Sequence, residues 1–497
     1  MDEQYAEHGG VSAERREKLA AWRDTGAAYP TRYQPRDEIG GLRDTYESLE
    51  PGQDADVVHR VAGRVIARRE HGKLTFIVLK DMSGELQLFC QLDALGAERY
   101  EALRHVDLGD FVGAEGVMMR TRRGELSLRV TSWRLLSKSL RGMPEKYHGL
   151  TSVETRYRKR YLDLAANDDS REVFVKRARI IAAVRRFLDD RGFVEVETPI
   201  LQPLYGGALA KPFITHHNEL ERDLYLRIAT ELYLKRCIIG GIDRVYEIGK
   251  DFRNEGVSFK HNPEFTMLET YEAYVDYNHV MTMVEEMTAA AAQAVGPLEV
   301  TFRGQRIDLT PPWPRLTMRR AIEAETGIDI GADDARTVAD LQARVREKGL
   351  EGVVPFVPTW GAQVDELFSE CVEPRLVQPV FITEHPLETS PFAKKTPADP
   401  RFVERFEGFI AGMEVSNAFS ELNDPDDQRE RFLQQMQDFA DGDESAHRLD
   451  EDFLEAMEHG MPPTGGMGMG IDRLVMVLTG APSIRDVILF PALRGQD

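Results

Sequence analysis

Cysteine is scarce in this sequence, with three residues among 497. These are Cys90, Cys237 and Cys371, which lie far apart and show no C-x-x-C spacing. A disulfide framework and a cysteine-based zinc site are therefore not expected, and the scarcity fits the reducing cytoplasm. We accordingly expect a cytoplasmic protein.

Long apolar runs are also missing, since no stretch of about 18 or more uninterrupted apolar residues occurs. We therefore expect no membrane span and no membrane partner. The first ten residues, MDEQYAEHGG, are acidic and lack the basic and apolar segments of a secretory signal, so none is expected. The hydrophobic content of 42% and the charged content of 30% are typical of a globular enzyme.

Basic charge is in deficit overall, because the formal net charge is −21 at pH 7. The basic residues nevertheless gather locally: residues 57–73 hold five Lys or Arg against one acid, and residues 118–146 hold eight against two. A local basic face decides whether phosphates can dock, whatever the net charge. Charge alone leaves two readings open, a nucleic-acid face and an ordinary solvated surface.

The length implies more than one domain, since single cores rarely grow past about 250–300 residues. Five short β-like runs separated by turns occupy about 80 residues, which predicts a small β-barrel of the oligonucleotide-binding (OB) type. Long helical patterns then mix with strands and predict a large α+β domain. We divide the chain into a helical extension (1–54) that contains SAERREKLAAWRD, the barrel (55–140), a basic linker (141–165) and the α+β domain (166–497).

Two residues of the predicted barrel have side chains suited to nucleic acid. Phe76 lies in a strand beside a basic stretch, where an exposed ring could stack on a base. Gln87 could read a base edge through hydrogen bonds. Position alone, however, favours a core role for Phe76.

The large domain begins with a helical pattern in residues 177–201. Apolar residues follow helical spacing there, and Gly192 ends the helix. A strand, FVEVETPIL, is predicted to follow. Because Pro199 cannot donate to a ladder, the strand belongs at a sheet edge or a bulge. A long helix beside an edge strand is also a plausible subunit interface.

The stretch FRNEGVSFKHNPEFT, residues 252–266, is predicted to be a loop between two strands. Strand alternation places Phe265, Glu269 and Tyr271 on one face. Arg253 and Glu255, on the incoming arm, fit a single face as well. Buried charges must be paired, so this set does not suit an apolar core. It favours a site for an anion and a planar ring, and a solvated sheet face is the alternative.

A hairpin is predicted at residues 405–423, with its turn at Ala411-Gly412. Glu407 and Glu414 stand one on each arm, and such carboxylates suit Mg²⁺. On the second strand the residues of one face are Asn417, Phe419 and Glu421. Simple alternation puts Glu414 on the opposite face. A bulge near the turn, or an indirect role for Glu414, would resolve the conflict.

Glycines at 466, 468 and 470 lead into a predicted helix that carries Arg473 near its start. The spacing fits neither the dinucleotide fingerprint nor the P-loop, because their spacings and the GK[ST] ending are absent. A helix start favours anions and glycines permit close approach. A purely structural glycine-rich strand is equally compatible with this stretch.

These three segments, in this order, resemble the three signature motifs of class II aminoacyl-tRNA synthetases. The helix and strand ending at Pro199 resemble the first motif, FRNEG…HNPEFT the second and GMGMGIDRLVMVL the third. The runs KPFITHHNELERDLYLRIATELYLKR, NAFSELNDPDDQRERF and GIDRLVMVLTGAPSIRDVILFP are similar to the bacterial lysyl-tRNA synthetases within that class. Upstream, RREKLAAWRDTGAAYP and KYHGLTSVETRYRKRYLDL extend the resemblance over nearly the whole chain.

The resemblance implies an OB-type barrel that binds the anticodon and a catalytic domain built on an antiparallel sheet. It implies that L-lysine and ATP form lysyl-adenylate with release of pyrophosphate. The lysyl group then passes to the 3′-terminal adenosine of tRNA(Lys). The implied partners are tRNA(Lys), L-lysine, ATP with Mg²⁺, and a second copy of the chain bound through residues 177–201.

The resemblance also implies residue roles. Arg253 would hold the α-phosphate and the lysine carboxylate, and with Arg473 it forms the implied catalytic pair. The implied ATP-binding residues are Arg253, Glu255, His261, Phe265, Glu407 and Arg473, with Phe265 and Arg473 on either side of the adenine. The implied metal ligands are Glu407 and Glu414. The implied lysine-binding residues are Gly207, Glu231, Glu269, Tyr271, Asn417, Phe419 and Glu421.

In the barrel, the positions implied to read the anticodon are Arg69, Phe76, Gln87 and Glu125, which reverses the preference for a core role of Phe76. Some positions depart from the common family pattern without removing an implied ligand; these are Lys211, Thr230 and Ala418. Lys260, at the tip of the FRNEG loop, has no role set by alternation and is the residue that would approach the tRNA acceptor end.

Two rival functions are weighed against this one. A synthetase for aspartate or asparagine would need a cation facing the substrate side chain, and Glu421 with Glu269 argues against that. A repurposed paralogue that joins lysine to a protein, or a non-enzymatic binder, is the other. The protein ligases lack the barrel that this chain keeps, and a binder would be expected to have lost Arg253, Arg473 or the acidic pair.

Overall fold

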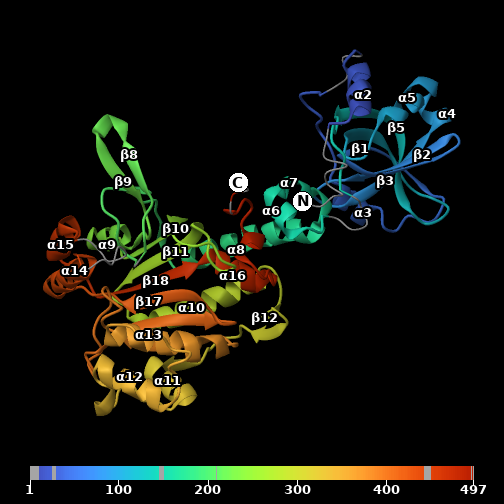
Figure 1. The fold of residues 1–497 in the computed structure, drawn as a ribbon. Coiled ribbons are helices and arrows are strands. Elements are labelled where there is room, and N and C mark those ends of the chain that lie inside the picture. The colour runs from blue at the N-terminus through green and yellow to red at the C-terminus, as the bar shows by residue number, and fades with distance from the viewer. Residues whose placement is uncertain are drawn as a thin grey trace. The chain divides into compact units, whose positions relative to one another are not determined.

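The computed structural model describes residues 11–24, 29–144, 150–208, 210–440, 449–493 and 495. The chain divides into two compact units, residues 1–168 and residues 169–497. Figure 1 shows the first unit in blue to teal and the second from green to red. Each unit has its own hydrophobic core.

The first unit contains a closed barrel in the strand order β1-β2-β3-β5-β4. The strands are β1 (Asp54–His71), β2 (Leu74–Lys80), β3 (Glu85–Gln91), β4 (Phe111–Arg120) and β5 (Leu126–Ser137). Short helices accompany them: α3 (Ile39–Thr45), α4 (Leu92–Leu95), α5 (Ala97–Glu101) and η1 (Ala102–His105). In β2, Thr75, Ile77 and Leu79 point inward and are buried, as strand alternation requires. The predicted five-stranded barrel is confirmed.

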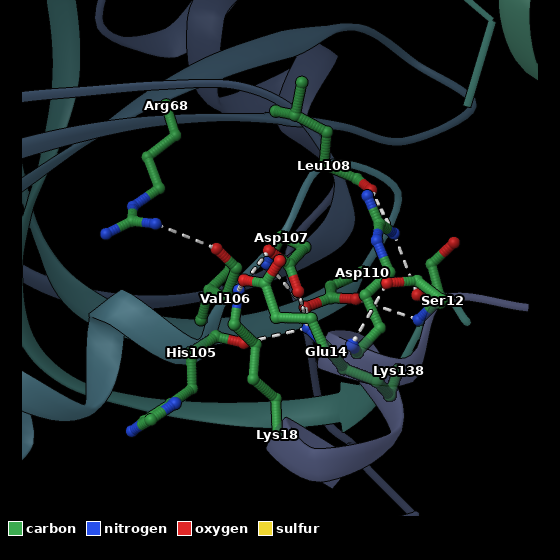
Figure 2. Close-up of polar contacts among 12 residues, drawn as sticks. Ser12, Glu14, Lys18, Arg68, His105, Val106, Asp107, Leu108, Asp110 and Lys138 are labelled. Atoms are coloured by element: carbon green, nitrogen blue, oxygen red, sulfur yellow. Dashed lines mark hydrogen bonds and ion pairs between the residues drawn. The ribbon is translucent and has the colours of Figure 1, made fainter. Parts of the chain in front are cut away.

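The predicted helix at SAERREKLAAWRD is confirmed as α2 (Ala13–Asp24). It is attached to the barrel by a buried ion network (Figure 2). Lys18 Nζ lies 2.8 Å from Asp107 Oδ1. Lys138 Nζ, whose side chain is fully buried, lies 2.5 Å from Asp107 Oδ2 and 2.7 Å from Asp110 Oδ2. Such buried charges are tolerated because each has its partner.

The expected linker contains two short helices in its described residues. It carries α6 (Val153–Arg158) and α7 (Arg160–Ala166). Arg160 Nη1 donates to Asp163 Oδ2 at 2.6 Å, and both side chains are buried. Arg156 Nε donates to Asp163 Oδ1 at 2.9 Å. The two helices are therefore joined by a buried charge cluster.

The second unit is built on an eight-stranded sheet in the order β14-β15-β16-β17-β18-β11-β10-β6. Its strands are β6 (Val194–Glu195), β10 (Arg244–Phe252), β11 (Glu264–Ala273), β14 (Arg315–Thr317), β15 (Val380–Pro386), β16 (Phe402–Ile410), β17 (Met413–Ser420) and β18 (Thr464–Gly470). The inner strands pair antiparallel, and only the two end strands pair parallel. The predicted α+β class with an antiparallel catalytic sheet is confirmed.

One face of this sheet packs on helices α8 (Asp168–Asp189), α10 (Tyr277–Gln293) and α16 (Ile471–Thr479). Leu268 of β11 and Met469 of β18 contribute to that core. Because side chains alternate along a strand, Met267 and Glu269 must point to the opposite face. That opposite face carries the candidate site described below.

The helix and strand predicted for residues 177–201 differ in part from those observed. The helix begins at Asp168, well before residue 177, and ends at Asp189, after which Gly192 takes a left-handed φ of 77°. The single strand predicted for FVEVETPIL is wrong in extent. Val194–Glu195 pairs with β10 at the sheet edge, and Pro199 separates it from β7 (Leu201–Gln202). The edge position itself is as predicted, since proline cannot extend the ladder.

The remaining elements surround the sheet. A three-stranded sheet contains β7, β9 (Arg222–Leu226) and β8 (Ile214–His217), and a hairpin contains β12 (Glu299–Phe302) and β13 (Gln305–Asp308). The other helices are η2 (Asn218–Leu220), α9 (Glu231–Ile239), α11 (Met318–Thr326), η3 (Asp333–Ala335), α12 (Val338–Glu347), α13 (Trp360–Cys371), η4 (Glu373–Arg375), α14 (Pro425–Ala440), α15 (Glu451–Glu458) and α17 (Ile484–Val487). Within the described ranges, none of the helices is long and apolar enough to cross a membrane.

Candidate active site

A cavity of about 390 Å³ opens on the face of the large sheet that lies opposite to α8, α10 and α16. Its lining comes from β11, β17 and β18, from α9 and from the loop between β10 and β11. Elements far apart in the sequence therefore meet at one site. The residues expected to act and found in the lining are Gly207, Glu231, Arg253, Glu255, His261, Phe265, Glu269, Tyr271, Glu414, Asn417, Phe419 and Arg473.

Regular pairing of β11 with β10 explains why three of the expected residues of β11 lie on one face. Phe265, Glu269 and Tyr271 line the cavity together, as alternation predicted. Arg253 lies on the same side, with its guanidinium carbon 5.1 Å from the centre of the Phe265 ring. The Arg253 Nε is buried and has no hydrogen-bond partner among the described residues. A donor in that situation favours a ligand that accepts hydrogen bonds.

The contacts that hold the loop between β10 and β11 include a side-chain hydrogen bond within it and two contacts to other residues. Ser258 and His261 share a hydrogen bond between Oγ and Nδ1 of 2.9 Å. Lys260 Nζ lies 3.2 Å from Glu373 Oε1. Phe259 lies beneath Arg303, whose guanidinium carbon is 4.4 Å from the ring centre. Burial, helped by the nearby positive charges, lowers the pKa of His261 to about 4, so its ring is neutral at pH 7.

The β16–β17 hairpin resolves the conflict over Glu414. Phe409 pairs with Glu414, whereas Gly408 pairs with Ser416, so Val415 is an extra residue in a β-bulge. The bulge turns Glu414 to the face of Asn417. Asn417 Nδ2 donates to Glu414 Oε1 at 3.3 Å and to Glu407 Oε1 at 3.2 Å. Of the two resolutions open from the sequence, the bulge is confirmed.

Arginines set the charge around this pair of carboxylates. Arg405 Nη2 donates to Glu407 Oε1 at 2.6 Å, and Arg473 Nη1 lies 3.2 Å from Glu414 Oε2. Burial, and then repulsion from Glu414, raises the pKa of Glu407 to about 8. Burial would also raise the pKa of Glu414, but Arg473, Arg405 and Arg253 outweigh it and bring the pKa below its usual value.

The same carboxylates are the candidates for holding a metal ion. No cluster of three or more metal-type side chains occurs in the described part of the chain. Mg²⁺ bound to phosphates, however, needs only one or two protein carboxylates. Glu407 and Glu414 share one amide donor and repel each other, so a divalent cation fits between them chemically.

Three more carboxylates gather at the other end of the site. Glu231, Glu269 and Glu421 are all buried. Glu269 accepts hydrogen bonds from the Tyr271 hydroxyl at 3.1 Å and from the Thr230 amide at 2.9 Å. Burial raises the pKa of Glu269 and that of Glu421 to about 8, with neighbouring carboxylates adding to the effect. A cationic ligand would reverse these shifts.

Two glycines make room for this acidic end. A Cβ on Gly466 would lie 1.9 Å from Glu421 Oε1 and 2.5 Å from the Tyr271 ring. A Cβ on Gly207, which has a φ of 87°, would lie 3.0 Å from the Glu231 Cβ. The glycine at 466 is therefore required by the close approach of Glu421 and Tyr271.

Sequence reasoning missed Arg405 and Lys235. Arg405 lies two residues before Glu407 on the same strand, so the two share a face. Lys235 lies four residues after Glu231 in α9, the spacing at which helix side chains meet. Its Nζ is 2.5 Å from Glu231 Oε1 and 2.5 Å from Glu421 Oε2. The spacings of Arg405 to Glu407 and of Glu231 to Lys235 are visible in the sequence, whereas the contact of Lys235 with Glu421 comes only from the fold.

The barrel holds the other set of expected residues. Arg69 pairs with Phe76, and Phe76 pairs with Phe89, so these three point to one outer face. Phe76 is half-buried and meets Phe89 edge-on at 5.5 Å, so the core role favoured by position alone is wrong. Gln87 is buried, and its amide donates to Ser127 Oγ at 2.9 Å. Glu125 is exposed just before β5.

Comparisons with known proteins agree with this arrangement. A family model described as tRNA synthetases class II (D, K and N) matches residues 152–494, and one described as OB-fold nucleic acid binding domain matches residues 59–136. A lysine–tRNA ligase of Moorella thermoacetica is 52% identical, with 98% of each chain covered. That of Chloroflexus aurantiacus is 52% identical over 97% of this chain and 98% of its own. That of Bacillus subtilis is 49% identical over 97% of this chain and 96% of its own.

Proposed function

The chain belongs to the lysine–tRNA ligases, a family of class II aminoacyl-tRNA synthetases, and from that premise we propose how its residues carry out the reaction. It activates L-lysine with ATP, forms lysyl-adenylate and pyrophosphate, and transfers the lysyl group to the 3′-terminal adenosine of tRNA. The observation that supports these roles is the buried acidic end of the cavity, where Glu231 and Glu269 line the wall and Glu421 lies behind it, joined to Glu231 through Lys235.

We place the lysine side chain toward that acidic end. Glu421, Glu269 and the Tyr271 hydroxyl meet the ε-ammonium, and Glu231 with Gly207 meets the α-ammonium. The supporting facts are burial, the raised pKa of Glu269 and Glu421, and the room left by Gly466. Asn417 and Phe419, which also line the cavity, pack beside the aliphatic part of lysine.

We place ATP toward the arginine end. Phe265 stacks on the adenine and Arg473 covers its other face, as cation and ring attract each other. Glu255 and the neutral ring of His261 hydrogen-bond to the nucleotide. Arg253, whose Nε has no described protein partner, holds the α-phosphate and the lysine carboxylate. The reaction needs no protein nucleophile, because the lysine carboxylate itself attacks the α-phosphorus and pyrophosphate leaves.

Catalysis then rests on positioning and on charge. Arg253 and Arg473 stabilise negative charge that develops at the α-phosphate, and the N-terminus of α16 adds its dipole to Arg473. Enzymes of this class use ATP with a divalent metal. We propose that the metal is Mg²⁺ and that Glu407 and Glu414 hold it. When bound, it neutralises triphosphate charge.

We also propose which parts of the chain contact tRNA(Lys) and a second copy of the chain. The barrel face around Phe76 reads the anticodon of tRNA(Lys), with Arg69, Gln87 and Glu125 beside it. Lys260 approaches the acceptor end of the tRNA.

A homodimer forms through residues 177–201. Two apolar side chains of this segment are exposed, Val194 with an exposed fraction of 49% and Leu201 with 47%. A sedimentation mass of one chain, not two, would overturn the dimer. A role in translation, together with three free cysteines, supports a cytoplasmic location.

Lysine binding is expected to strengthen as the pH rises. Glu269 and Glu421, with a pKa of about 8 each, are partly protonated at pH 7 in the empty site. Pairing with ammonium requires the ionised form, so binding lowers their pKa and releases protons. The lysine Kd should therefore fall between pH 6.5 and 8.5, by up to about tenfold per pH unit for each proton released. Calorimetry over this range checks the slope, and a flat Kd would contradict the roles of both carboxylates.

The Phe76→Ala variant should separate the two reaction steps. Loss of base stacking is expected to cost about 1–3 kcal/mol of tRNA binding, which is roughly tenfold to a hundredfold in kcat/KM for charging. ATP–pyrophosphate exchange should remain at the wild-type level, since it needs no anticodon. Phe111→Ala is the matched control, because Phe111 is an exposed ring on β4 of the same barrel. Loss of exchange together with charging would show that Phe76 supports folding only.

A further inference from the structure

A fully buried lysine lies behind the acidic end of the cavity. The Lys235 side chain has no exposed surface, and its Nζ contacts Glu231 Oε1 and Glu421 Oε2, at 2.5 Å each. The Phe392 ring centre lies 4.9 Å from the same nitrogen. Burial alone lowers the pKa of Lys235, but its two carboxylate partners raise it above the usual value, so the ammonium form is kept.

Each of these carboxylates has one oxygen at Lys235 and a second oxygen elsewhere. Glu421 Oε1 lies over Gly466 beside the Tyr271 ring and has no hydrogen-bond partner among the described residues. Glu231 Oε2 lies 3.6 Å from where a Cβ on Gly207 would be. The ammonium of Lys235 thus holds both side chains, while the second oxygen of Glu421 lies beside Gly466 and that of Glu231 beside Gly207.

Lys235 also changes the total charge at the acidic end of the cavity. Glu231, Glu269 and Glu421 carry three negative charges when ionised, and Lys235 contributes one positive charge. Tyr271 stays neutral, because burial raises its pKa well above the usual value. These four side chains therefore carry a net charge of two minus when all are ionised. Free lysine brings two ammonium groups, while its carboxylate is placed at Arg253.

We propose that Lys235 is a positioning residue for the amino-acid substrate, which orients Glu231 and Glu421 and matches the charge of the pocket to a ligand with two ammonium groups. The inference rests on the proposed placement of lysine. Without Lys235, two buried carboxylates would lose their shared cation, and three negative charges would face two positive ones. A buried charge mismatch is relieved by taking up a proton, which a bound lysine would then have to displace.

The test is the Lys235→Met variant in ATP–pyrophosphate exchange, since methionine keeps the length and removes the charge. The lysine KM should rise at least tenfold, while kcat falls less than threefold and the ATP KM stays unchanged. Calorimetry in buffers of different ionisation enthalpy should detect about one more proton released per lysine bound than in the wild type. Lys235→Arg, which keeps the charge, should recover most of the lysine affinity.

Lys138→Met is the matched control. Lys138 is another fully buried lysine held by two carboxylates, Asp107 and Asp110, but it lies in the barrel (Figure 2). Its loss should lower thermal stability and leave the lysine KM of exchange unchanged. A purely structural role for Lys235 would give the same result, with lysine KM and proton release as in the wild type, and would overturn the proposal.

Two further outcomes are separable. If Lys235→Met does not fold, Lys235→Gln replaces it, because the amide can still donate to one carboxylate while the charge is lost. An unchanged lysine KM in that variant overturns the proposal just as well. Failure of the wild-type protein to show lysine-dependent exchange would instead contradict the proposed function, and the two failures are thereby distinguished.

Discussion

Replacing Arg253 by alanine is expected to lower kcat/KM for lysine-dependent ATP–pyrophosphate exchange by about 10²–10³-fold. Removal of one donor that stabilises developing charge in a closed site typically costs that much. Arg253 lines the cavity beside Phe265, and its buried Nε has no described protein partner that would compete with a phosphate. The effect should fall mainly on kcat, because charge at the α-phosphate grows in the transition state.

The matched control for this prediction is Lys250→Ala. Lys250 is a basic residue near the end of β10, the strand that leads into Arg253. It does not line the main cavity, and its Nζ lies 3.9 Å from Glu264 Oε1. Its loss should leave exchange close to the wild-type rate. An Arg253→Ala enzyme that keeps more than a tenth of the wild-type kcat/KM would show that this guanidinium is not at the reacting phosphate.

Replacing Glu421 by glutamine is expected to raise the lysine KM well over tenfold. Glu421 is fully buried, and a hydrogen bond to a charged group contributes about 1.5–3 kcal/mol, or roughly tenfold to a hundredfold. The ATP KM should be unaffected, since the nucleotide is placed at the arginine end. Steady-state exchange at varied lysine and varied ATP separates the two constants.

Glu285→Gln serves as the control for burial. Glu285 is a buried glutamate of α10 that accepts the Trp313 amide at 2.8 Å and takes no part in the site. Both variants should lose some stability, but only Glu421→Gln should lose lysine affinity. An unchanged lysine KM in Glu421→Gln would contradict its contact with the ε-ammonium.

Local sequence rules located much of the site because β11 is a regular strand. Alternation alone placed Phe265, Glu269 and Tyr271 on one face, and all three line the cavity. The same rule failed at Glu414, because a single extra residue, Val415, shifts the register of the hairpin. A bulge changes few local preferences, so the sequence could suggest it without deciding it.

Long-range packing explains the other differences between the sequence predictions and the structure. FVEVETPIL has the composition of a strand, but only Val194–Glu195 finds a partner at the sheet edge. Lys235 was overlooked because a lysine on a helix is usually solvated, and only the fold brings Glu421 to its ammonium. Phe76 could not be assigned from position, since a half-buried ring and a core ring have the same local pattern. The resemblance to a family, not periodicity, supplied its expected role.

ATP–pyrophosphate exchange measured separately with each of the twenty amino acids tests the central claim most directly. Three buried carboxylates, two of which line one end of the cavity, are balanced in part by Lys235 and are suited to a substrate with two ammonium groups. Exchange should depend on ATP and be supported by lysine well above every other amino acid. Exchange with aspartate or asparagine and none with lysine would contradict it.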